Sequence, residues 1–391
     1  MQSAVDRRRA LAAAGIATLL VTMWYALAAN FLYGGNWTGL YCNGAETAFP
    51  QDIVREGLFQ GPSKGGYDGQ FYHLIAHDPL LQTDYSRYMF LPRIRYQRIL
   101  IPGLAWLAAF GHPRLIDPMF VAVMVGFLAL GVWWCARLCG EIGRNPYFGL
   151  LFLLLPGALI TLDRFNVDIP LCAFAAGFAY YWRKRATGPL IAIAAAAPLA
   201  RETGFVFPLA LAAYFLAEKR WRPLLAACAA ALPALIWFAF VAQRTPHEEI
   251  TVWRDTFPLG WAFHALAHPQ AYPGPGWISG VATTLDRAAL VGTLLCLVLA
   301  ARPGRDGWKS PVYFLNALFA CAAAAIATVS SLDTWQDVFG YGRYVSPLIL
   351  LAALRTLETG GAAGFLPWIP MAARAGIPLA SQFLTMLRRG V

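Results

Sequence analysis

Long apolar stretches alternate with short polar turns along most of the chain, which predicts an all-helical protein crossing a membrane many times. Stretches of roughly 17–25 apolar residues are long enough to span a bilayer. The first stretch, at 10–32, is longer than the apolar part of a cleavable signal peptide, so we interpret it as an uncleaved helix. The other spans are expected at 115–138, 146–162, 168–182, 187–200, 203–217, 223–242, 286–301, 310–330 and 344–356. We therefore expect about ten transmembrane helices.

Three longer polar segments interrupt this single transmembrane domain, 1–391. They are a large first outer loop at 33–114, a second outer loop at 243–285, and a tail at 358–391. Within the first loop, RILIPGLAWLAAFG is short and contains proline, so we expect an interfacial or re-entrant helix there. The tail contains Arg374 within AARAG, which favours a position at the membrane interface. Nine or eleven spans remain compatible with these two ambiguous regions.

Composition supports a membrane protein and explains the net charge of +10. Only 13% of the 391 residues are charged and 58% are hydrophobic, with a mean hydropathy of +0.51, whereas soluble domains carry roughly a quarter charged residues. Basic residues cluster at 7–9, 183–185, 218–222 and 302–309, which is typical of cytoplasmic turns. This pattern places both termini in the cytoplasm and gives no reason to expect a nucleic-acid partner. The Ala- and Arg-rich composition indicates a bacterial inner-membrane protein.

The outer ends of the predicted spans carry acids and bases together, unlike the inner turns, in which Lys and Arg predominate. Ionisable groups at membrane depth are costly, so we expect them to line a wet cavity; charge at the membrane interface is the simpler alternative. The sequence PLARETGFVFP breaks two apolar helices with an adjacent base and acid, as in proteins that bind ligands at broken helices. The candidates for substrate binding in these outer turns are Arg164, Asp168, Arg201, Glu202, Arg343 and Tyr344.

The stretch GGYDGQFYHLIAHDP, at 65–79, contains the main catalytic candidate. Its glycines permit a turn, and the spacing of Phe71, Leu74 and Ile75 predicts an amphipathic helix on or dipping into the membrane. Asp68 precedes this helix, where it could cap the N-terminus. Alternatively, its carboxylate could accept a proton from an acceptor hydroxyl or hold a divalent cation.

Other polar residues of the first loop are candidates for contact with substrate. His73 and His77 are four residues apart and could begin a metal site, but no third ligand is adjacent, so we predict no metal site there. We expect His73 to hydrogen-bond the substrate, and we include Tyr67 and Gln70 beside it. Arg98, in RIRYQR, suits a phosphate or anchors the loop to anionic lipid head groups.

The combination of YDGQFY, RYQRILIPGLAW, NVDIPLCAF, LARETGFVFP and GRYVSPL resembles the GT-C superfamily of membrane glycosyltransferases. That superfamily includes the GPI and protein mannosyltransferases and the aminoarabinose transferase of lipid A. The resemblance implies inverting transfer of a sugar from a polyprenyl-phosphate donor to a glycan, lipid or protein acceptor on the periplasmic face. It also implies that Asp68 is the base and that Arg201 and Arg343 are candidates for the donor phosphate. The first loop has no clear acidic pair, so no cofactor is certain and a divalent cation is only an option.

Two other classes of function remain open. A transporter or flippase for a lipid-linked or small anion could use the same charges, but transporters place ionisable residues near the midplane and often contain repeats. A non-catalytic scaffold of an envelope-assembly complex would leave the charged outer ends unexplained. The position of the charges at one face favours an enzyme.

Overall fold

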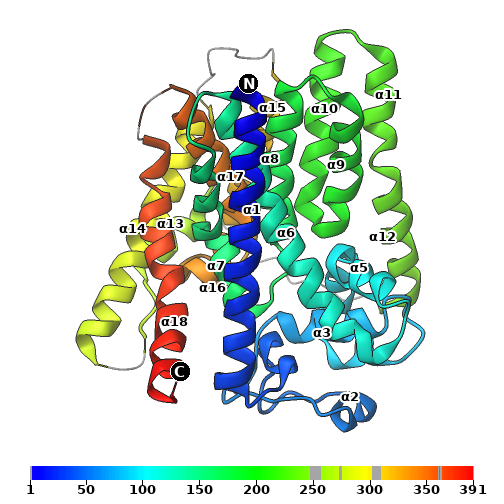
Figure 1. Cartoon of the computed structure of the whole chain (residues 1–391), viewed down its shortest axis with the longest axis vertical. Helices are drawn as coiled ribbons and strands as arrows, with labels where there is room; N and C mark the ends of the chain where they lie inside the picture. Colours follow the sequence, from blue (N-terminus) through cyan, green and yellow to red (C-terminus); the bar gives the residue numbers. More distant parts are fainter. Residues whose placement is uncertain are drawn as a thin grey trace.

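The chain forms a bundle of helices that run between two ends of the molecule (Figure 1). A computed structural model describes residues 2–246, 257–272, 275–301, 310–359, 361 and 363–390. The described residues contain no β-strand, so the predicted all-α class is confirmed. The basic turn at 302–309 and part of the second outer loop lie outside the described residues.

Within the described residues, five helical segments are long and apolar enough to cross a membrane, and a bent pair would make a sixth. The protein therefore has the helices of a multi-pass membrane protein, but the expected ten spans are not confirmed. The five segments are α1 (Gln2–Leu27) with η1 (Ala28–Leu32), α6 (Pro113–Glu141), α11 (Trp221–Ala229) with α12 (Leu232–Arg244), α14 (Gly276–Ala301) and α15 (Pro311–Val329).

The remaining helices are shorter, bent or less apolar. In the bundle they are η4 (Pro146–Leu154), α7 (Pro156–Arg164), α8 (Ile169–Arg183), α9 (Thr187–Ala200), η5 (Glu202–Phe205), α10 (Val206–Ala217), α17 (Val338–Thr359), η7 (Ala363–Phe365) and α18 (Trp368–Arg388). In the loops they are η2 (Trp37–Tyr41), α2 (Gln51–Arg55), α3 (Gly69–His77), η3 (Tyr85–Tyr88), α4 (Pro92–Gln97), α5 (Leu100–Ala108), α13 (Gly260–Ala267) and α16 (Leu332–Gln336).

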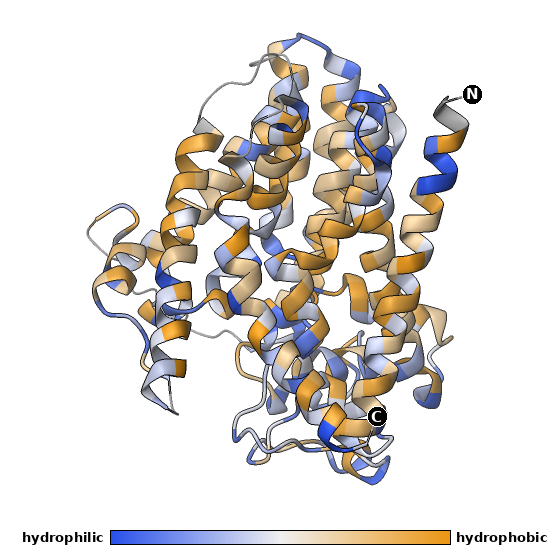
Figure 2. Ribbon diagram, turned by 60° about the vertical axis from the view of Figure 1, so that its left-hand side comes forward, coloured by the Kyte–Doolittle hydropathy of each residue, from blue (hydrophilic) through white to orange (hydrophobic). Residues whose placement is uncertain are grey.

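Helix α1 shows how the bundle is built without a soluble core. Ala10, Ala13 and Ala17 are fully buried where α1 packs on α6, because small side chains let two helix backbones approach closely. The other side of α1 exposes Leu19 and Met23. Figure 2 shows hydrophobic residues along most of the helices, with hydrophilic residues mainly in the loops at both ends. This distribution suits a lipid environment around the middle of the bundle.

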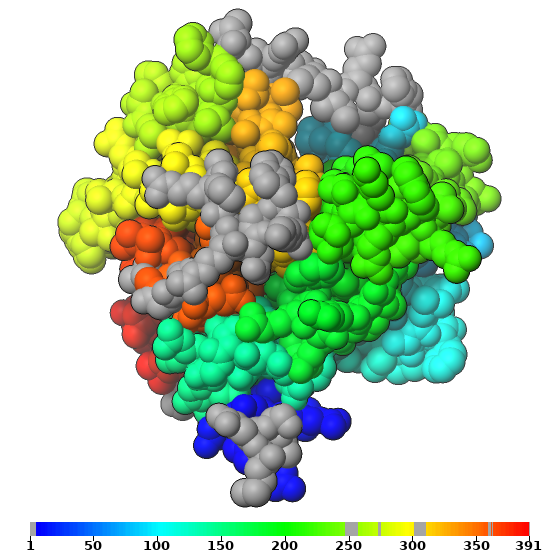
Figure 3. Space-filling model, turned by 90° about the horizontal axis from the view of Figure 1, so that it is seen from above, coloured from blue at the N-terminus to red at the C-terminus, as the bar shows by residue number. Residues whose placement is uncertain are grey.

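The end of the bundle that carries the N-terminus is basic. Arg183 at the end of α8 pairs with Glu358 of α17, and Lys184 pairs with Glu141 at the end of α6. The ends of these three helices therefore meet beside the start of α1. Figure 3 looks onto this end of the molecule and shows α1 at the edge of the bundle.

The C-terminal tail differs from the expected interfacial segment. Helix α18 packs against α14 and α7, and its Arg374 is buried in an ion pair with Asp286 of α14 (3.0 Å). The charge of Arg374 is compensated, so the tail can join the bundle. Arg389 donates a hydrogen bond to the carbonyl oxygen of Phe31, in η1 beyond the far end of α1, and Figure 1 places the two termini at opposite ends. This arrangement differs from the expectation of two termini on the same side.

Helix α3 also differs from the expected surface helix. Tyr72, His73, Leu74 and Ile75 are all buried, because α3 lies between η2, α5 and α6. Helix α5 packs beside it and is followed by Phe110, which is 94% exposed. The exposed apolar surface in this part of the loop is therefore provided by α5 and the residues just after it, and not by α3.

Candidate functional site

Arg201 lies at a break between two apolar helices, as the sequence ARETG predicted. Its backbone is extended (φ −165°, ψ 151°), which ends α9 before η5 begins. A Cβ on Gly204 would lie 2.1 Å from the carbonyl oxygen of Ala197, so only glycine fits this close approach. The break turns the side chains of Arg201 and Glu202 toward the interior of the bundle.

A second break lies between η4 and α7, which meet at an angle of 58°. Leu155 is extended (φ −60°, ψ 141°), as expected for a residue before proline, here Pro156. The backbone N–H of Gly157 then donates to Ser346 of α17 (2.8 Å). This bend positions the turn that carries Arg164 and Asp168.

Asp68 and Asp168 each precede a helix, but neither side chain caps it. The carboxylate of Asp68 instead contacts Arg343 of α17 (2.7 Å) and Arg95 of α4 (3.0 Å). Asp168 pairs with Arg201 and lies 3.8 Å from Arg343. Arg343 therefore links the first loop to the turn before α8.

The contacts continue from Arg201 into the first loop. Glu202 lies 3.5 Å from Arg201 and accepts two hydrogen bonds from Arg98, at 2.8 and 2.9 Å. Arg98 also donates to the hydroxyl of Tyr72 (3.1 Å). The resulting ion-pair network consists of Asp68, Arg95, Arg98, Asp168, Arg201, Glu202 and Arg343.

The ion-pair network is most buried at Arg201 and Asp168 and opens toward solvent at Asp68 and Glu202. The side chains of Arg201 and Asp168 are 1% and 4% exposed, whereas those of Asp68 and Glu202 are 21% and 36% exposed. Four guanidinium groups face three carboxylates, which leaves an excess positive charge in a largely dry place. Such a site favours an anionic ligand.

Aromatic rings line the arginines of the ion-pair network. The guanidinium carbon of Arg201 lies 4.1 Å from the centre of the Tyr344 ring. The Tyr67 ring lies 5.5 Å from the guanidinium of Arg343 and 4.4 Å from that of Arg164, which pairs with Asp163 (2.7 Å). The predicted residues Tyr67, Arg164 and Tyr344 thus adjoin the network without being ion-paired to it in these contacts.

Several buried guanidinium N–H groups of the ion-pair network have no hydrogen-bond partner among the described residues. They are Nε and Nη2 of Arg201 and Nε of Arg343. Buried donors in native proteins are nearly always paired. These atoms are therefore suited to donate charge-assisted hydrogen bonds to an oxyanion.

The environment of Asp68 keeps its carboxyl group ionised. Burial alone raises its pKa, but the guanidinium groups of Arg343 and Arg95 outweigh that effect and hold the pKa well below its usual range. Opposite charges at contact distance favour the charged form in this way. Asp68 is consequently a carboxylate throughout the neutral and mildly acidic range.

Two predicted substrate residues are not brought to the ion-pair network. Gln70 accepts a hydrogen bond from the N–H of Gly44 (3.1 Å) and donates one to the carbonyl oxygen of Gly65 (2.9 Å), so its amide holds the loop together. His73 points to the other side of α3, toward Asp117 of α6 (3.1 Å). In both cases the side chain has local partners that the sequence did not reveal.

Arg95 is the member of the ion-pair network that sequence reasoning did not select. It lies in α4, three residues before Arg98, which directly follows the helix, and residues spaced in this way lie close together at a helix end. Its guanidinium also stacks on the ring of Phe71, at 4.0 Å. The sequence RIRYQR contains three arginines, and the spacing alone did not show which of them join the network. Arg93 does not: it donates a hydrogen bond to Thr245, just after α12 (3.3 Å).

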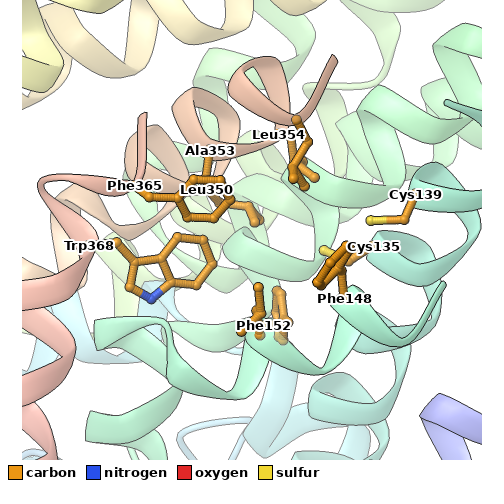
Figure 4. Close-up of a pocket in the computed structure, with 11 residues that line it drawn as sticks. Cys135, Cys139, Phe148, Phe152, Leu350, Ala353, Leu354, Phe365 and Trp368 are labelled. Atoms are coloured by element: carbon orange, nitrogen blue, oxygen red, sulfur yellow. The ribbon is translucent and has the colours of Figure 1, made fainter. Parts of the chain in front are cut away.

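A small cavity elsewhere in the bundle is a packing space and not a competing site. It lies between α6, η4, α17 and the segment before α18, and Figure 4 shows its apolar lining, including Phe152, Leu350 and Trp368. The volume available to water is about 20 Å³, enough for about one water molecule. Its only titratable side chains are Cys135 and Cys139, so it offers no group to bind an anion.

Comparisons with known proteins identify no relative. No family model matches the chain, and no curated protein or solved structure is significantly similar to it. The interpretation of the ion-pair network therefore rests on the chemistry of its own residues.

Proposed function

We propose that this chain is an inverting membrane glycosyltransferase that moves a sugar from a polyprenyl-phosphate donor to an acceptor hydroxyl on the outer face of a bacterial inner membrane. The proposal rests on the buried guanidinium N–H groups of Arg201 and Arg343 that have no hydrogen-bond partner among the described residues and that lie beside the carboxylate of Asp68. A phosphate-binding group next to a proton acceptor is the pair that transfer from a phosphate-linked donor requires.

The proposed reaction uses the two ends of the ion-pair network differently. The acceptor oxygen attacks the anomeric carbon of the sugar from the face opposite the phosphate, and the bond between that carbon and the phosphate oxygen breaks. Arg201 and Arg343 stabilise the negative charge that develops on the departing lipid phosphate. The proton of the acceptor hydroxyl passes to a carboxylate oxygen of Asp68.

The arginines around Asp68 make its basicity depend on donor binding. With Arg343 and Arg95 in contact, Asp68 has a pKa well below its usual range and is a weak base. A donor phosphate that takes hydrogen bonds from Arg343 withdraws that cation from the carboxylate. The proton affinity of Asp68 then rises only when donor is bound, which protects the resting site from protonation. The same arginines make this carboxylate a poor ligand for a divalent cation.

Membrane orientation follows from the charge of the two ends. The basic end beside the N-terminus is assigned to the cytoplasm, so the first loop and the ion-pair network face outward. A lipid-linked donor can reach this depth from the surrounding bilayer. The acceptor, whether glycan, lipid or protein, reaches the exposed side of Asp68 and Glu202.

The deciding experiment joins mass spectrometry with a transfer assay. The full chain, purified in mild detergent, is analysed for co-purified polyprenyl phosphate and then supplied with polyprenyl-phosphate sugars. Release of polyprenyl phosphate with formation of a glycosylated acceptor supports the proposal. Movement of intact donor across proteoliposomes without cleavage would identify a flippase, and neither activity with any donor would leave the scaffold alternative.

Arg343→Gln is expected to weaken donor binding by about 10-fold or more, because a charge-assisted hydrogen bond contributes roughly 1.5–3 kcal/mol. It also removes the largest of the three cationic contributions, from Arg343, Arg95 and Arg98, that lower the pKa of Asp68. Activity of the wild type is lost only as the pH falls through that low pKa, so the loss in the variant begins at a higher pH. Donor titration and a pH–rate profile measure both effects.

Arg87→Gln is the matched control, because Arg87 lies in the same loop as Asp68 but has a side chain that is 81% exposed. It should leave affinity and the pH profile unchanged. If Arg343→Gln behaves like this control, the phosphate binds elsewhere.

The position of α18 predicts that the C-terminus lies on the outer side, opposite the N-terminus. Alkaline phosphatase fused after the last residue should therefore be active, and a green fluorescent protein at the same place should remain dark. A fusion after Lys184, at the basic end, should give the reverse result. A fluorescent C-terminal fusion would show that α18 does not return across the membrane.

A further inference from the structure

A second polar cluster lies on the side of α3 that faces away from the ion-pair network. It consists of His73 and His77, one turn apart on α3, and Asp117 near the start of α6. The Nε2 atoms of His73 and His77 lie 3.1 and 3.6 Å from the same carboxylate oxygen of Asp117. One ligand atom from each of the three residues lies within 4.8 Å of the others.

We propose that His73, His77 and Asp117 form a site for a divalent transition-metal ion, with Zn²⁺ as the expected occupant. Two imidazoles and a carboxylate are ligands that Zn²⁺ takes, at about 2.0–2.2 Å. Tetrahedral bonds of that length place neighbouring ligand atoms about 3.3 Å apart, close to the two distances between the histidines and Asp117. The sequence HLIAH supplied two ligands, and the fold brings the third from another helix.

Hydrogen bonding alone does not account for this cluster. Nε2 of His73 lies 3.1 Å from Asp117 and can donate a hydrogen bond to it. Nε2 of His77 lies 3.6 Å from the same oxygen, which is too far for a hydrogen bond. Nε2 of His77 has no hydrogen-bond partner among the described residues, although its side chain is only 5% exposed. A metal ion bound by both imidazoles satisfies this buried nitrogen, which is aimed at the carboxylate.

Tyr41 supports the arrangement from behind the proposed ligands. Its hydroxyl donates to the same oxygen of Asp117 (2.9 Å), and its ring stacks on His73 with centroids 4.3 Å apart. Groups that orient metal ligands in this way commonly change metal affinity 10–100-fold. Nδ1 of His73 lacks such a partner among the described residues, so we expect a metal that chelators can remove.

The site would fasten α3, which begins directly after Asp68, to the long helix α6. The side chain of Asp117 is 22% exposed, which leaves a route for the ion. The metal is assigned a structural role, at a place separated from the ion-pair network by the width of α3. The inference therefore does not depend on the proposed transfer reaction.

The test measures metal binding on the full chain, purified with a tag that contains no histidine. Elemental analysis after growth with zinc should find about one ion per chain. After chelation, Co²⁺ should restore one equivalent and give the visible absorption of a site with nitrogen ligands. Zn²⁺ should also raise the thermal midpoint of the metal-free protein, because an ion that binds only the folded state stabilises it.

His77→Ala and Asp117→Asn should each weaken Co²⁺ binding at least about 10-fold, and Tyr41→Phe should do so about 10-fold through the ligand it orients. His264→Ala is the matched control, because His264 and His268 form another pair four residues apart, on and just after α13. It should bind Co²⁺ like the wild type.

A wild-type chain that retains no zinc and takes up no Co²⁺ would overturn the proposal, and so would equal affinity in all variants. A variant that has lost binding counts in favour only if its metal-free form melts like the metal-free wild type. If every ligand variant unfolds, the number of metal ions bound per wild-type chain and the Co²⁺ affinity of Tyr41→Phe still test the proposal.

Discussion

Asp68→Asn is expected to reduce sugar transfer by about 10²–10⁴-fold, the usual contribution of a general base, while the chain stays folded. Asparagine has nearly the shape of aspartate, and its single side-chain oxygen still accepts a hydrogen bond from one of the two arginines that contact Asp68, Arg343 or Arg95. It cannot take the proton of the acceptor hydroxyl. The measurement is the turnover of a polyprenyl-phosphate sugar by purified variant, with donor affinity determined separately.

Asp84→Asn is the control for this variant, because Asp84 lies in the same loop with a side chain that is 59% exposed. It should retain wild-type turnover. Wild-type turnover in Asp68→Asn would remove Asp68 as the base, whatever the donor affinity of that variant.

Arg201→Ala is expected to cost about 3–5 kcal/mol of stability, because removing one partner of a buried pair leaves the other charge unpaired. The stranded group is Asp168, whose side chain is 4% exposed. Arg343 lies 3.8 Å from it and offers only partial compensation. The loss should appear as a lower thermal midpoint in detergent and as reduced yield of folded protein.

The double variant Arg201→Met, Asp168→Leu separates stability from function. Apolar residues of similar size in place of a buried ion pair are often neutral or stabilising, so the double variant should melt near the wild type. Its affinity for the donor should nevertheless be lower than that of the wild type, because the phosphate-binding guanidinium of Arg201 is gone. Lys64→Ala, at an exposed pair with Glu46, should change neither property. A single variant as stable as the wild type would contradict the assigned burial of this pair.

The sequence predicted those parts of the fold that depend on local patterns. Apolar length identified α1, α6 and α15, and the prolines, glycine and charges of PLARETGFVFP located the break at Arg201. Spans with internal bends were harder to predict from the sequence. The segments η4 and α7, for example, form one continuous apolar stretch in the sequence, although the chain bends at Pro156 between them. The number of membrane crossings depends on such segments, because their length alone does not determine whether they cross the membrane.

Contacts between distant segments could not be predicted, because nothing local specifies them. Arg374 looked incompatible with a buried helix until Asp286 was found opposite it. Likewise, HLIAH lacked a third ligand because Asp117 belongs to the next helix of the bundle. Asp68 was expected either to cap a helix or to act chemically, and only the fold revealed its arginine partners.

The spread of the ion-pair network along the chain has a consequence for biogenesis. Asp168 and Arg201 are only 33 residues apart and can pair early, and Arg95 follows Asp68 within the same loop. Arg343 is 275 residues from Asp68, which corresponds to about 15–55 s of synthesis at 5–20 residues per second. Arg98 and Glu202, which are 104 residues apart, already join the first loop to the break at Arg201. Arrival of α17 in the membrane is then the last step that completes the network, and a chain truncated before it would leave Asp68 and Asp168 without Arg343.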